Sequence, residues 1–347
     1  MSDAEFETAV ARAGAFLRAS RAPLIAGLGA DVAGSVAAFR LARNLGAPID
    51  HAGAEWALRD QAVLQDIGLM LVSPGEARQR ADMLLLLGDR PLQAWPDLAD
   101  FLFADGPSGA RKINALGSRA PGPQNAGASW LRANANELPS LLAALRARVN
   151  GRPLAHNFKR TAELDNLATT LKAASFGVAL WCPDEIDALT IEMLTGLIKD
   201  LNAATRWSGL SVSPDASVTA AAMASGWMSG LPLRSSFARD RPRHDSWQYD
   251  ARRLVESREA DAVVWISVFG DAPPDWLGAV PAIVLGEPSA TSGAAISIPV
   301  GRPGRDHDGV VYDRMTGTLV EVLARAPNDM PSAAEALTRI AAAVSEP

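Results

Sequence analysis

The chain has one cysteine, Cys182, among its 347 residues, and this scarcity excludes several kinds of site. A single thiol allows no internal disulfide, no four-cysteine zinc site and no iron–sulfur cluster held by cysteines alone. Histidine is also scarce. His51, His156, His244 and His307 are far apart in sequence, and none has a second histidine at the spacing that places two on one helical face. The sequence therefore carries no conventional metal-binding motif.

Long apolar runs and an excess of positive charge are missing as well. No stretch of 18 apolar residues occurs, and segment 1–14 has acidic residues where a signal peptide has a basic and then an apolar run. The formal net charge is −6 and the pI is about 5.3, which argues against a surface for nucleic acid or anionic membranes. These absences predict a cytoplasmic protein that binds neither nucleic acid nor membrane.

Apolar side chains are abundant, at 48% of residues, and they occur as short runs between amphipathic segments. The runs at 23–27, 81–88, 176–181 and 260–267 are typical of buried parallel strands, and helical spacing of apolar residues predicts helices near 6–17, 32–45, 134–149, 161–173, 185–201 and 332–344. This alternation predicts an α/β protein with two doubly wound lobes.

The second half of the chain repeats the scheme of the first. Ala260-Asp261 and the apolar run after it resemble Ala81-Asp82 and its run. We therefore place a boundary near residue 150, with a first α/β lobe at 1–150 and a second at 151–347. The second lobe is expected to carry a strand and loop extension and a C-terminal helix.

Three residues fit part of a dinucleotide-binding fingerprint. Gly27 and Gly29 follow an expected strand and precede an expected helix, and Asp50 follows the next strand about 20 residues on. Val32 stands where the third glycine of the fingerprint belongs, so close packing of helix on strand is not specified. A plain strand-to-helix turn explains the glycines equally well, and we favour it over nicotinamide binding.

Two further segments allow a chemical or a structural interpretation. Arg305 to Gly309 contains carboxylates beside His307 and would suit either a metal ion or an Asx turn, and no fourth ligand is visible. Cys182 stands at the start of an expected helix, where a thiol can have a lowered pKa. No histidine is placed beside it, so a structural role is favoured.

The segment from Phe237 to Tyr249 is dense in arginine and aromatic side chains. Arg239, Arg243, Trp247 and Tyr249 belong to the residue types enriched at the anchors of protein interfaces. This segment is either a solvated loop or a loop that contacts a partner or borders a vestigial active site.

Taken in order along the chain, these landmarks resemble the B subunit of formylmethanofuran dehydrogenase, a relative of the molybdopterin-dependent formate dehydrogenases. The shared pieces are Gly46-Ala47-Pro48-Ile49-Asp50, Leu64-Gln65-Asp66-Ile67-Gly68, Ala81-Asp82 with its strand, the turn from Pro91 to Pro96, Leu201-Asn202, Val218-Thr219, Trp227, Gly230, Pro232 and the loop from Phe237 to Arg243. The resemblance implies two Rossmann-like lobes, as in the central domains of formate dehydrogenase and DMSO reductase-type proteins, without the iron–sulfur domain.

The chain departs from this family at the positions that carry its chemistry. The resemblance places the metal-ligating cysteine and the histidine after it at Trp56 and Ala57, and the active-site arginine and a nearby histidine at Ser213 and Asp215. An indole supplies no thiolate to molybdenum or tungsten. We therefore expect the molybdopterin or tungstopterin and the iron–sulfur cluster to be lost, with no cofactor in this chain and Trp56 filling the former metal cleft.

This degenerate pattern is similar to the B subunit of the bacterial formyltransferase/hydrolase complex of one-carbon metabolism, which serves formaldehyde oxidation in methylotrophs. The resemblance implies a pseudoenzyme scaffold whose partners are a zinc-dependent amidohydrolase-like A subunit, a C subunit and a formyltransferase D subunit. Those partners move a formyl group from tetrahydromethanopterin to a methanofuran-type carrier and hydrolyse it to formate. The alternative is an oxidoreductase subunit that retains a pterin or dinucleotide between its lobes.

Overall fold

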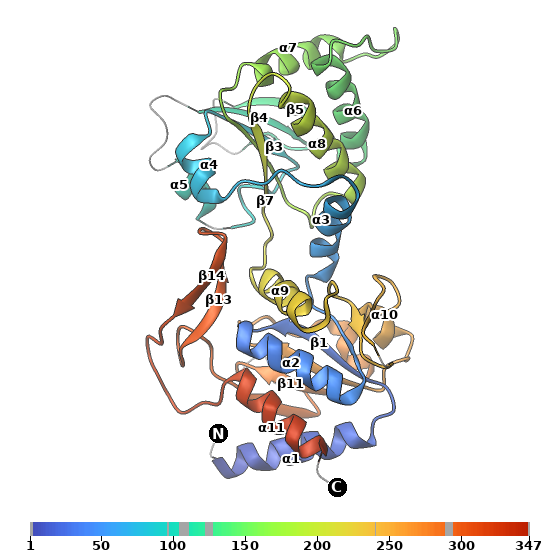
Figure 1. Cartoon of the computed structure of the whole chain (residues 1–347), viewed down its shortest axis with the longest axis vertical. Helices are drawn as coiled ribbons and strands as arrows, with labels where there is room; N and C mark the ends of the chain where they lie inside the picture. The colour runs from blue at the N-terminus through green and yellow to red at the C-terminus, as the bar shows by residue number, and fades with distance from the viewer. Residues whose placement is uncertain are drawn as a thin grey trace. The chain divides into compact units, whose positions relative to one another are not determined.

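The computed structural model describes residues 3–95, 97–103, 111–121, 128–239, 241–288 and 294–345. The chain forms two compact units. Unit 1 comprises Met1–Leu58, Asp215–Asp313 and Thr318–Pro347, and unit 2 comprises Arg59–Pro214 and Arg314–Gly317. Each unit is mixed α/β and is built on a sheet that is largely or wholly parallel (Figure 1).

The predicted boundary near residue 150 is wrong, because strands from both halves of the chain pair within each sheet. In unit 1, β10 (Ala262–Ser267) pairs with β1 (Pro23–Gly29). In unit 2, β6 (Gly177–Trp181) pairs with β3 (Met83–Leu87). The two similar apolar runs seen in the sequence are thus strands of different units, and each lies in the interior of its own sheet.

The sheet of unit 1 has the strand order β12-β11-β10-β1-β2-β8-β9, and its first five strands are parallel. The last two, β8 (Ser235–Ser236) and β9 (Arg243–His244), pair antiparallel. The other elements are α1 (Asp3–Ala19), α2 (Val32–Leu45), β2 (Pro48–Ile49), α9 (Ser217–Ser229), α10 (Ala251–Glu256), a 3-10 helix (Asp275–Ala279), β11 (Ala282–Gly286), β12 (Ile296–Pro299), the hairpin of β13 (Gly309–Asp313) and β14 (Thr318–Val322), and α11 (Ala333–Ser345).

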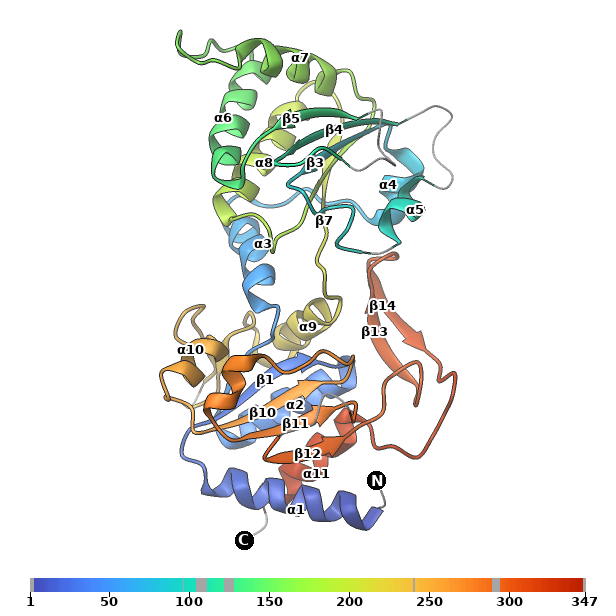
Figure 2. The same ribbon diagram turned by 180° about the vertical axis from the view of Figure 1, so that it is seen from behind.

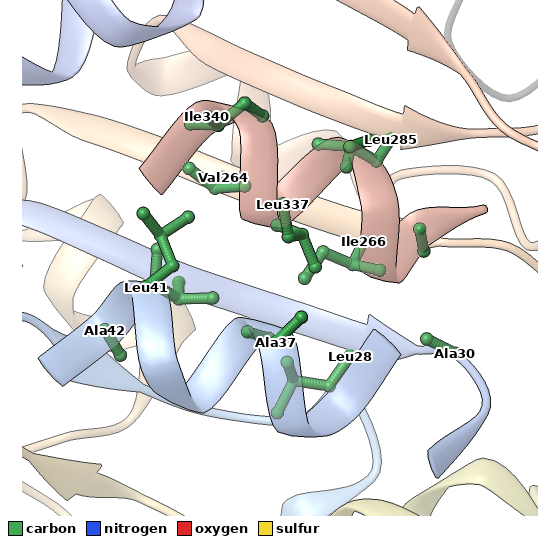
Figure 3. Close-up of a cluster of buried hydrophobic side chains, with 14 of the residues drawn as sticks. Leu28, Ala30, Ala37, Leu41, Ala42, Val264, Ile266, Leu285, Leu337 and Ile340 are labelled. Carbon is green, nitrogen blue, oxygen red and sulfur yellow. The ribbon is translucent and has the colours of Figure 1, made fainter. Parts of the chain in front are cut away.

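The two faces of this sheet are buried by alternate residues of the central strands. Leu24 of β1 and Val263 of β10 belong to a cluster that includes α10, whereas Ile25 of β1 and Val264 of β10 belong to the larger cluster under α1, α2, α9 and α11. Figure 3 shows Leu41 and Ala37 of α2 and Leu337 and Ile340 of α11 turned toward Val264 and Ile266 of β10. Burial of both faces explains why these strands are apolar throughout.

The sheet of unit 2 is entirely parallel, with the order β5-β4-β3-β6-β7 (Figure 2). Its elements are α4 (Pro74–Arg80), β3, α5 (Leu98–Phe103), β4 (Lys112–Gly117), β5 (Ser129–Arg132), a 3-10 turn (Ala135–Glu137), α6 (Leu138–Val149), α7 (Thr161–Lys172), β6, α8 (Ala188–Leu201) and β7 (Trp207–Ser211). Helix α3 (Ala54–Ile67) begins in unit 1 and ends in unit 2. Apolar clusters bury both faces of this sheet as well.

The predicted helix over 32–45 is confirmed as α2, and its ends show why the local sequence specifies it. The Asp31 side chain accepts a hydrogen bond from the N–H of Gly34 and caps the first turn. Gly46 ends the helix in the left-handed conformation with φ of 62°. Within the described ranges, none of the helices has the length and apolar character needed to cross a bilayer.

Candidate functional site

Polar residues of unit 1 gather where its parallel strands end. Asp31 follows β1, Asp50 and His51 follow β2, and Asp215 and Ser217 lie at the start of α9. All of these except Asp215 are buried although they are polar. Open α/β sheets bind their ligands at the carboxyl ends of the strands. This edge of unit 1 is therefore the candidate site.

The His51 imidazole is fully buried and belongs to a chain of hydrogen bonds. Its Nδ1 accepts the N–H of Gly53 at 2.7 Å, so the ring proton resides on Nε2, which lies 3.0 Å from Ser217 Oγ. The Ser217 hydroxyl in turn donates to Asp215 Oδ1 at 2.7 Å. Burial lowers the pKa of His51 to about 4, although the nearby Asp215 carboxylate acts in the opposite direction. The ring is neutral and is held in place by these hydrogen bonds. In a nucleophilic triad the serine hydroxyl donates to the imidazole, whereas here it donates to the carboxylate of Asp215.

Arg234 forms a second polar centre of unit 1, held by three carboxylates. Its guanidinium lies 3.4 Å from Asp50 Oδ2, 3.1 Å from Glu55 Oε2 and 2.6 Å from Asp250 Oδ2, and it also donates to the carbonyl of Ser246. Arg234 has φ of +61°, a conformation that a non-glycine residue adopts only when its surroundings require it. The cluster ties the end of β2, the start of α3 and the start of α10 together.

The proposed dinucleotide residues are engaged within the chain. Asp50 accepts the N–H of His51 at 2.8 Å and that of Ala251 at 2.9 Å, and burial raises its pKa to about 7 in spite of Arg234. Gly27 has φ of +84°, and a Cβ there would lie 2.6 Å from the carbonyl oxygen of Ile266. Gly29 has only ordinary contacts at 3.5 Å. Gly27 thus serves the close approach of β1 and β10, which suits a structural turn.

The positions where the resemblance places the family's chemistry lie in different units. Trp56 and Ala57 are half-buried on the part of α3 that belongs to unit 1, and the Trp56 ring lies over Gly53. Asp215 joins the His51 chain. Ser213 belongs to unit 2, where its carbonyl accepts the indole N–H of Trp95 at 2.5 Å. Whether Trp56 fills a former metal cleft remains a prediction.

The residues present do not fit a molybdenum or tungsten pterin centre. Trp56 offers no ligand atom, and Cys182 lies in unit 2 with its Sγ 2.8 Å from Asp184 Oδ1 and 3.0 Å from the carbonyl of Val212. Burial raises the pKa of this thiol far above its ordinary value, which fits a structural cysteine. In the ranges that the structure describes, no three His, Cys, Asp or Glu side chains are grouped so that they could hold a metal ion.

The segment from Arg305 to Gly309 makes internal contacts that suit a turn. Asp306 accepts hydrogen bonds from Arg305, from the N–H of Arg302 and from Asn328, and these lower its pKa to about 2. The two ring nitrogens of His307 lie against the carbonyls of Asp308 and Gly301. These contacts occupy the groups that a metal would need.

The segment from Phe237 to Tyr249 is only partly a loop, because Arg243 and His244 form β9. Asp240 lies outside the described residues, as does Pro96 of the shared turn. Arg239 and Arg243 are exposed, Trp247 is 71% exposed, and Tyr249 is half-buried. The Trp247 backbone is held by Asp245, and the Arg253 guanidinium lies 4.5 Å from the centre of its ring.

Sequence reasoning named Asp50 and Asp215 but missed His51, Ser217, Arg234 and Asp250. His51 could have been found, because it directly follows Asp50 at the end of an expected strand. Nothing in the local sequence indicates that Arg234 would meet carboxylates from three separate segments. That contact exists only because β8 extends the sheet beside β2.

Comparison with known proteins identifies the family. The chain is 35% identical to the B subunit of the formyltransferase/hydrolase complex Fhc of Methylorubrum extorquens, over 97% of this chain and 94% of that protein. The chain belongs to the Fhc B-subunit family. It is also 23% identical to the B subunit of the tungsten-containing formylmethanofuran dehydrogenase 2 of Methanocaldococcus jannaschii, over 92% of this chain and 78% of that protein. The resemblance drawn from the sequence is confirmed.

A solved structure gives the same result for the fold of this member of the Fhc B-subunit family. The chain matches a chain of the crystal structure of FhcABCD from Methylorubrum extorquens, determined in complex with methylofuran, with a TM-score of 0.89 and 32% identity. The match covers 99% of this chain and 96% of the other. No family model matches the sequence.

Proposed function

We propose that this chain is a non-catalytic scaffold subunit of a formyltransferase/hydrolase complex in one-carbon metabolism. Its partners would be the zinc-dependent amidohydrolase-like A subunit, the C subunit and the formyltransferase D subunit. They would transfer the formyl group from formyl-tetrahydromethanopterin to a methanofuran-type carrier and hydrolyse it to formate. The observation that carries the proposal is the match to the Fhc B subunit over nearly the whole length of both chains.

The scaffold role is supported by the contacts of the polar residues in unit 1, which are made within the chain. Trp56 supplies no ligand, and the carboxylate of Asp50 and the imidazole of His51 are engaged by other groups of unit 1. We further propose that both units are Rossmann-like, of the kind found in formate dehydrogenase and DMSO reductase-type proteins. The five-stranded parallel sheet of unit 2 supports this assignment.

Trp247 and its neighbours are the part of unit 1 that we propose to contact a partner subunit. The backbone at Trp247 is held by hydrogen bonds from the backbone N–H groups of Trp247 and Gln248 to Asp245 Oδ1, and the exposed indole makes a cation–π contact with Arg253. A large aromatic side chain held rigidly in solvent loses little entropy on binding, which is typical of interface anchors. We expect Arg239→Ala combined with Arg243→Ala to weaken assembly, and Trp247→Ala to do so more strongly.

A matched control for these changes is Arg12→Ala combined with Arg40→Ala, which removes two other exposed arginines of unit 1. Assembly is measured by native mass spectrometry after co-expression with the A, C and D subunits of the same source. If the Arg239/Arg243 and Trp247 variants assemble as well as the control, the assignment of this surface is wrong.

The proposed function itself is tested by purifying the tagged chain from its source cell and by reconstitution. We expect it to co-elute with an amidohydrolase-like subunit that contains zinc and with a formyltransferase. Formyl transfer and hydrolysis should require the assembled complex and survive Trp56→Phe, because Trp56 carries no chemistry. Elution as a free chain with a bound pterin or nucleotide would contradict the proposal.

A further inference from the structure

The carboxyl edge of the unit 2 sheet has a topological switch point, the kind of place where open α/β sheets bind anionic ligands. From β3 the chain crosses to β4 on one side, and from β6 it crosses to β7 on the other side. The loops after β3 and β6 therefore leave the sheet in opposite directions from adjacent strands. In open α/β sheets this switch point is where ligands bind, with phosphate groups on backbone N–H groups.

The loop after β3 has the backbone geometry of an anion cradle. Gly88 has φ of +88°, and the next two N–H groups, those of Asp89 and Arg90, point to one acceptor. Consecutive N–H groups arranged in this way form a concave nest for negatively charged oxygens. In this chain the acceptor is the carboxylate of Glu185, with Oε1 2.6 Å from the Asp89 nitrogen and Oε2 3.0 Å from the Arg90 nitrogen.

Glu185 reaches the cradle from the loop after β6, across the switch point. It packs so closely that a Cβ on Gly88 would lie 2.4 Å from its Oε2. The other charged groups of these loops are also paired within the chain. The Arg90 guanidinium pairs with Asp184, and the Asp89 carboxylate turns away to accept hydrogen bonds from the Ser118 hydroxyl and the Arg119 N–H.

We infer that Glu185 is a built-in substitute for an anionic ligand: its carboxylate occupies a cradle suited to a phosphate group and thereby closes the site. The inference does not depend on the function proposed above. It assigns Glu185 two effects, since the carboxylate satisfies two backbone donors of the fold and also excludes phosphorylated ligands. Removing the carboxylate should destabilise unit 2 and at the same time create a phosphate-binding site.

The test compares wild type, Glu185→Ala and the control Glu163→Ala, which removes an exposed carboxylate of unit 2 that pairs with Arg160. Thermal unfolding of the full chain is followed with inorganic pyrophosphate, with ADP, or with sodium chloride at the same ionic strength. We expect Glu185→Ala to have a lower Tm than wild type and pyrophosphate to raise it saturably by about 5 °C. Wild type and Glu163→Ala should not respond. Tighter binding of ADP would identify a nucleotide as the preferred source of the phosphate, and equal binding would identify the diphosphate alone.

If Glu185→Ala is insoluble, Glu185→Ser is used, because its short polar side chain carries no charge and does not reach the cradle that the glutamate carboxylate fills. Isothermal titration should then show pyrophosphate binding at least tenfold tighter to the variant than to wild type. The inference is overturned if the folded variant binds pyrophosphate no better than wild type does. In that case Glu185 is a structural link between two loops, and the cradle does not recognise phosphate.

Discussion

Replacing His51 by asparagine removes the buried imidazole of the candidate site, and we expect it to change how the stability of unit 1 depends on pH. In the His51→Asn variant the amide oxygen of the introduced side chain can still accept the N–H of Gly53, but the side chain does not titrate. The perturbation therefore leaves one hydrogen bond of the wild-type ring in place and removes the proton-binding group.

The expected magnitude follows from the displacement of the pKa. The ordinary value for histidine is 6.5, and burial lowers that of His51 in the folded chain to about 4. Between these values the unfolded chain binds a proton that the folded chain does not, so stability is lost as the pH falls through this window. One pKa unit corresponds to about 1.4 kcal/mol, so the loss from His51 at pH 4 is about 3 kcal/mol. For a folding unit of 150–250 residues this is a Tm change of the order of 10 °C.

The assay is thermal unfolding of wild type and His51→Asn at a series of pH values from 7.5 to 4 in 0.15 M salt. All other titrating groups are shared, so their effects cancel in the difference between the two Tm values. We expect the Tm of wild type relative to the variant to fall by about 10 °C across the series. The chain has four histidines, so the imidazole NMR signals are few enough to follow the His51 titration directly.

Asp50 provides the matched experiment of opposite sign. Burial raises its pKa from an ordinary 3.8 to about 7, so the folded chain holds a proton that the unfolded chain releases, and stability is lost as the pH rises through this window. The Tm of wild type relative to Asp50→Asn should therefore fall toward pH 7. If the Tm difference between wild type and His51→Asn is constant from pH 7.5 to 4, His51 titrates normally in the folded chain and the burial argument is refuted.

Three further changes have defined outcomes. Trp56→Cys should restore no metal binding, because the rest of the donor set is also absent, and stoichiometric molybdenum or tungsten by elemental analysis would contradict this. Asn114→Val should raise the free energy of unfolding by about 1 kcal/mol, because the buried Asn114 side chain has an Nδ2 with no hydrogen-bond partner, and urea titration measures it. Gly27→Ala should lower the free energy of unfolding by about 2 kcal/mol or more in the same assay, since its Cβ would meet a strand backbone. The control Gly226→Ala, in open space on α9, should be neutral or slightly stabilising.

Part of the helices and strands could be predicted from the sequence, but helices α3 and α9 and the division into units were not. α2 is specified locally by apolar spacing, by Asp31 at its start and by Gly46 at its end. The pairing of β1 with β10 joins residues about 240 positions apart, and the sequence of neither strand indicates which strand it pairs with. Both strands are apolar throughout and would suit any central place in a parallel sheet. The boundary near 150 followed from local resemblance between strands, which carries no information on pairing.

The candidate site, too, contains residues that the local sequence indicates and residues that it does not. Asp50 was identified from its place after an expected strand, a property of the local sequence. Its partner Arg234 lies more than 180 positions along the chain, and the guanidinium reaches it only through the antiparallel pairing of β8 with β2. The family could still be recognised, because recognition needs only the order and spacing of short motifs along the chain. It does not require knowledge of which residues are in contact.

At the carboxyl edges of both sheets, polar and charged groups are paired with other groups of the same chain. Catalytic sites position polar groups for a substrate, and some of these groups form their hydrogen bonds or ion pairs only when the ligand binds. In unit 1 three carboxylates pair with the Arg234 guanidinium, although its buried Nε has no hydrogen-bond partner among the described residues, and in unit 2 Glu185 accepts the two N–H groups of the cradle after β3. At both edges, charged or polar groups of the chain thus pair with one another. This is the arrangement expected of a fold kept for its surfaces, and the response of Glu185→Ala to pyrophosphate measures it directly.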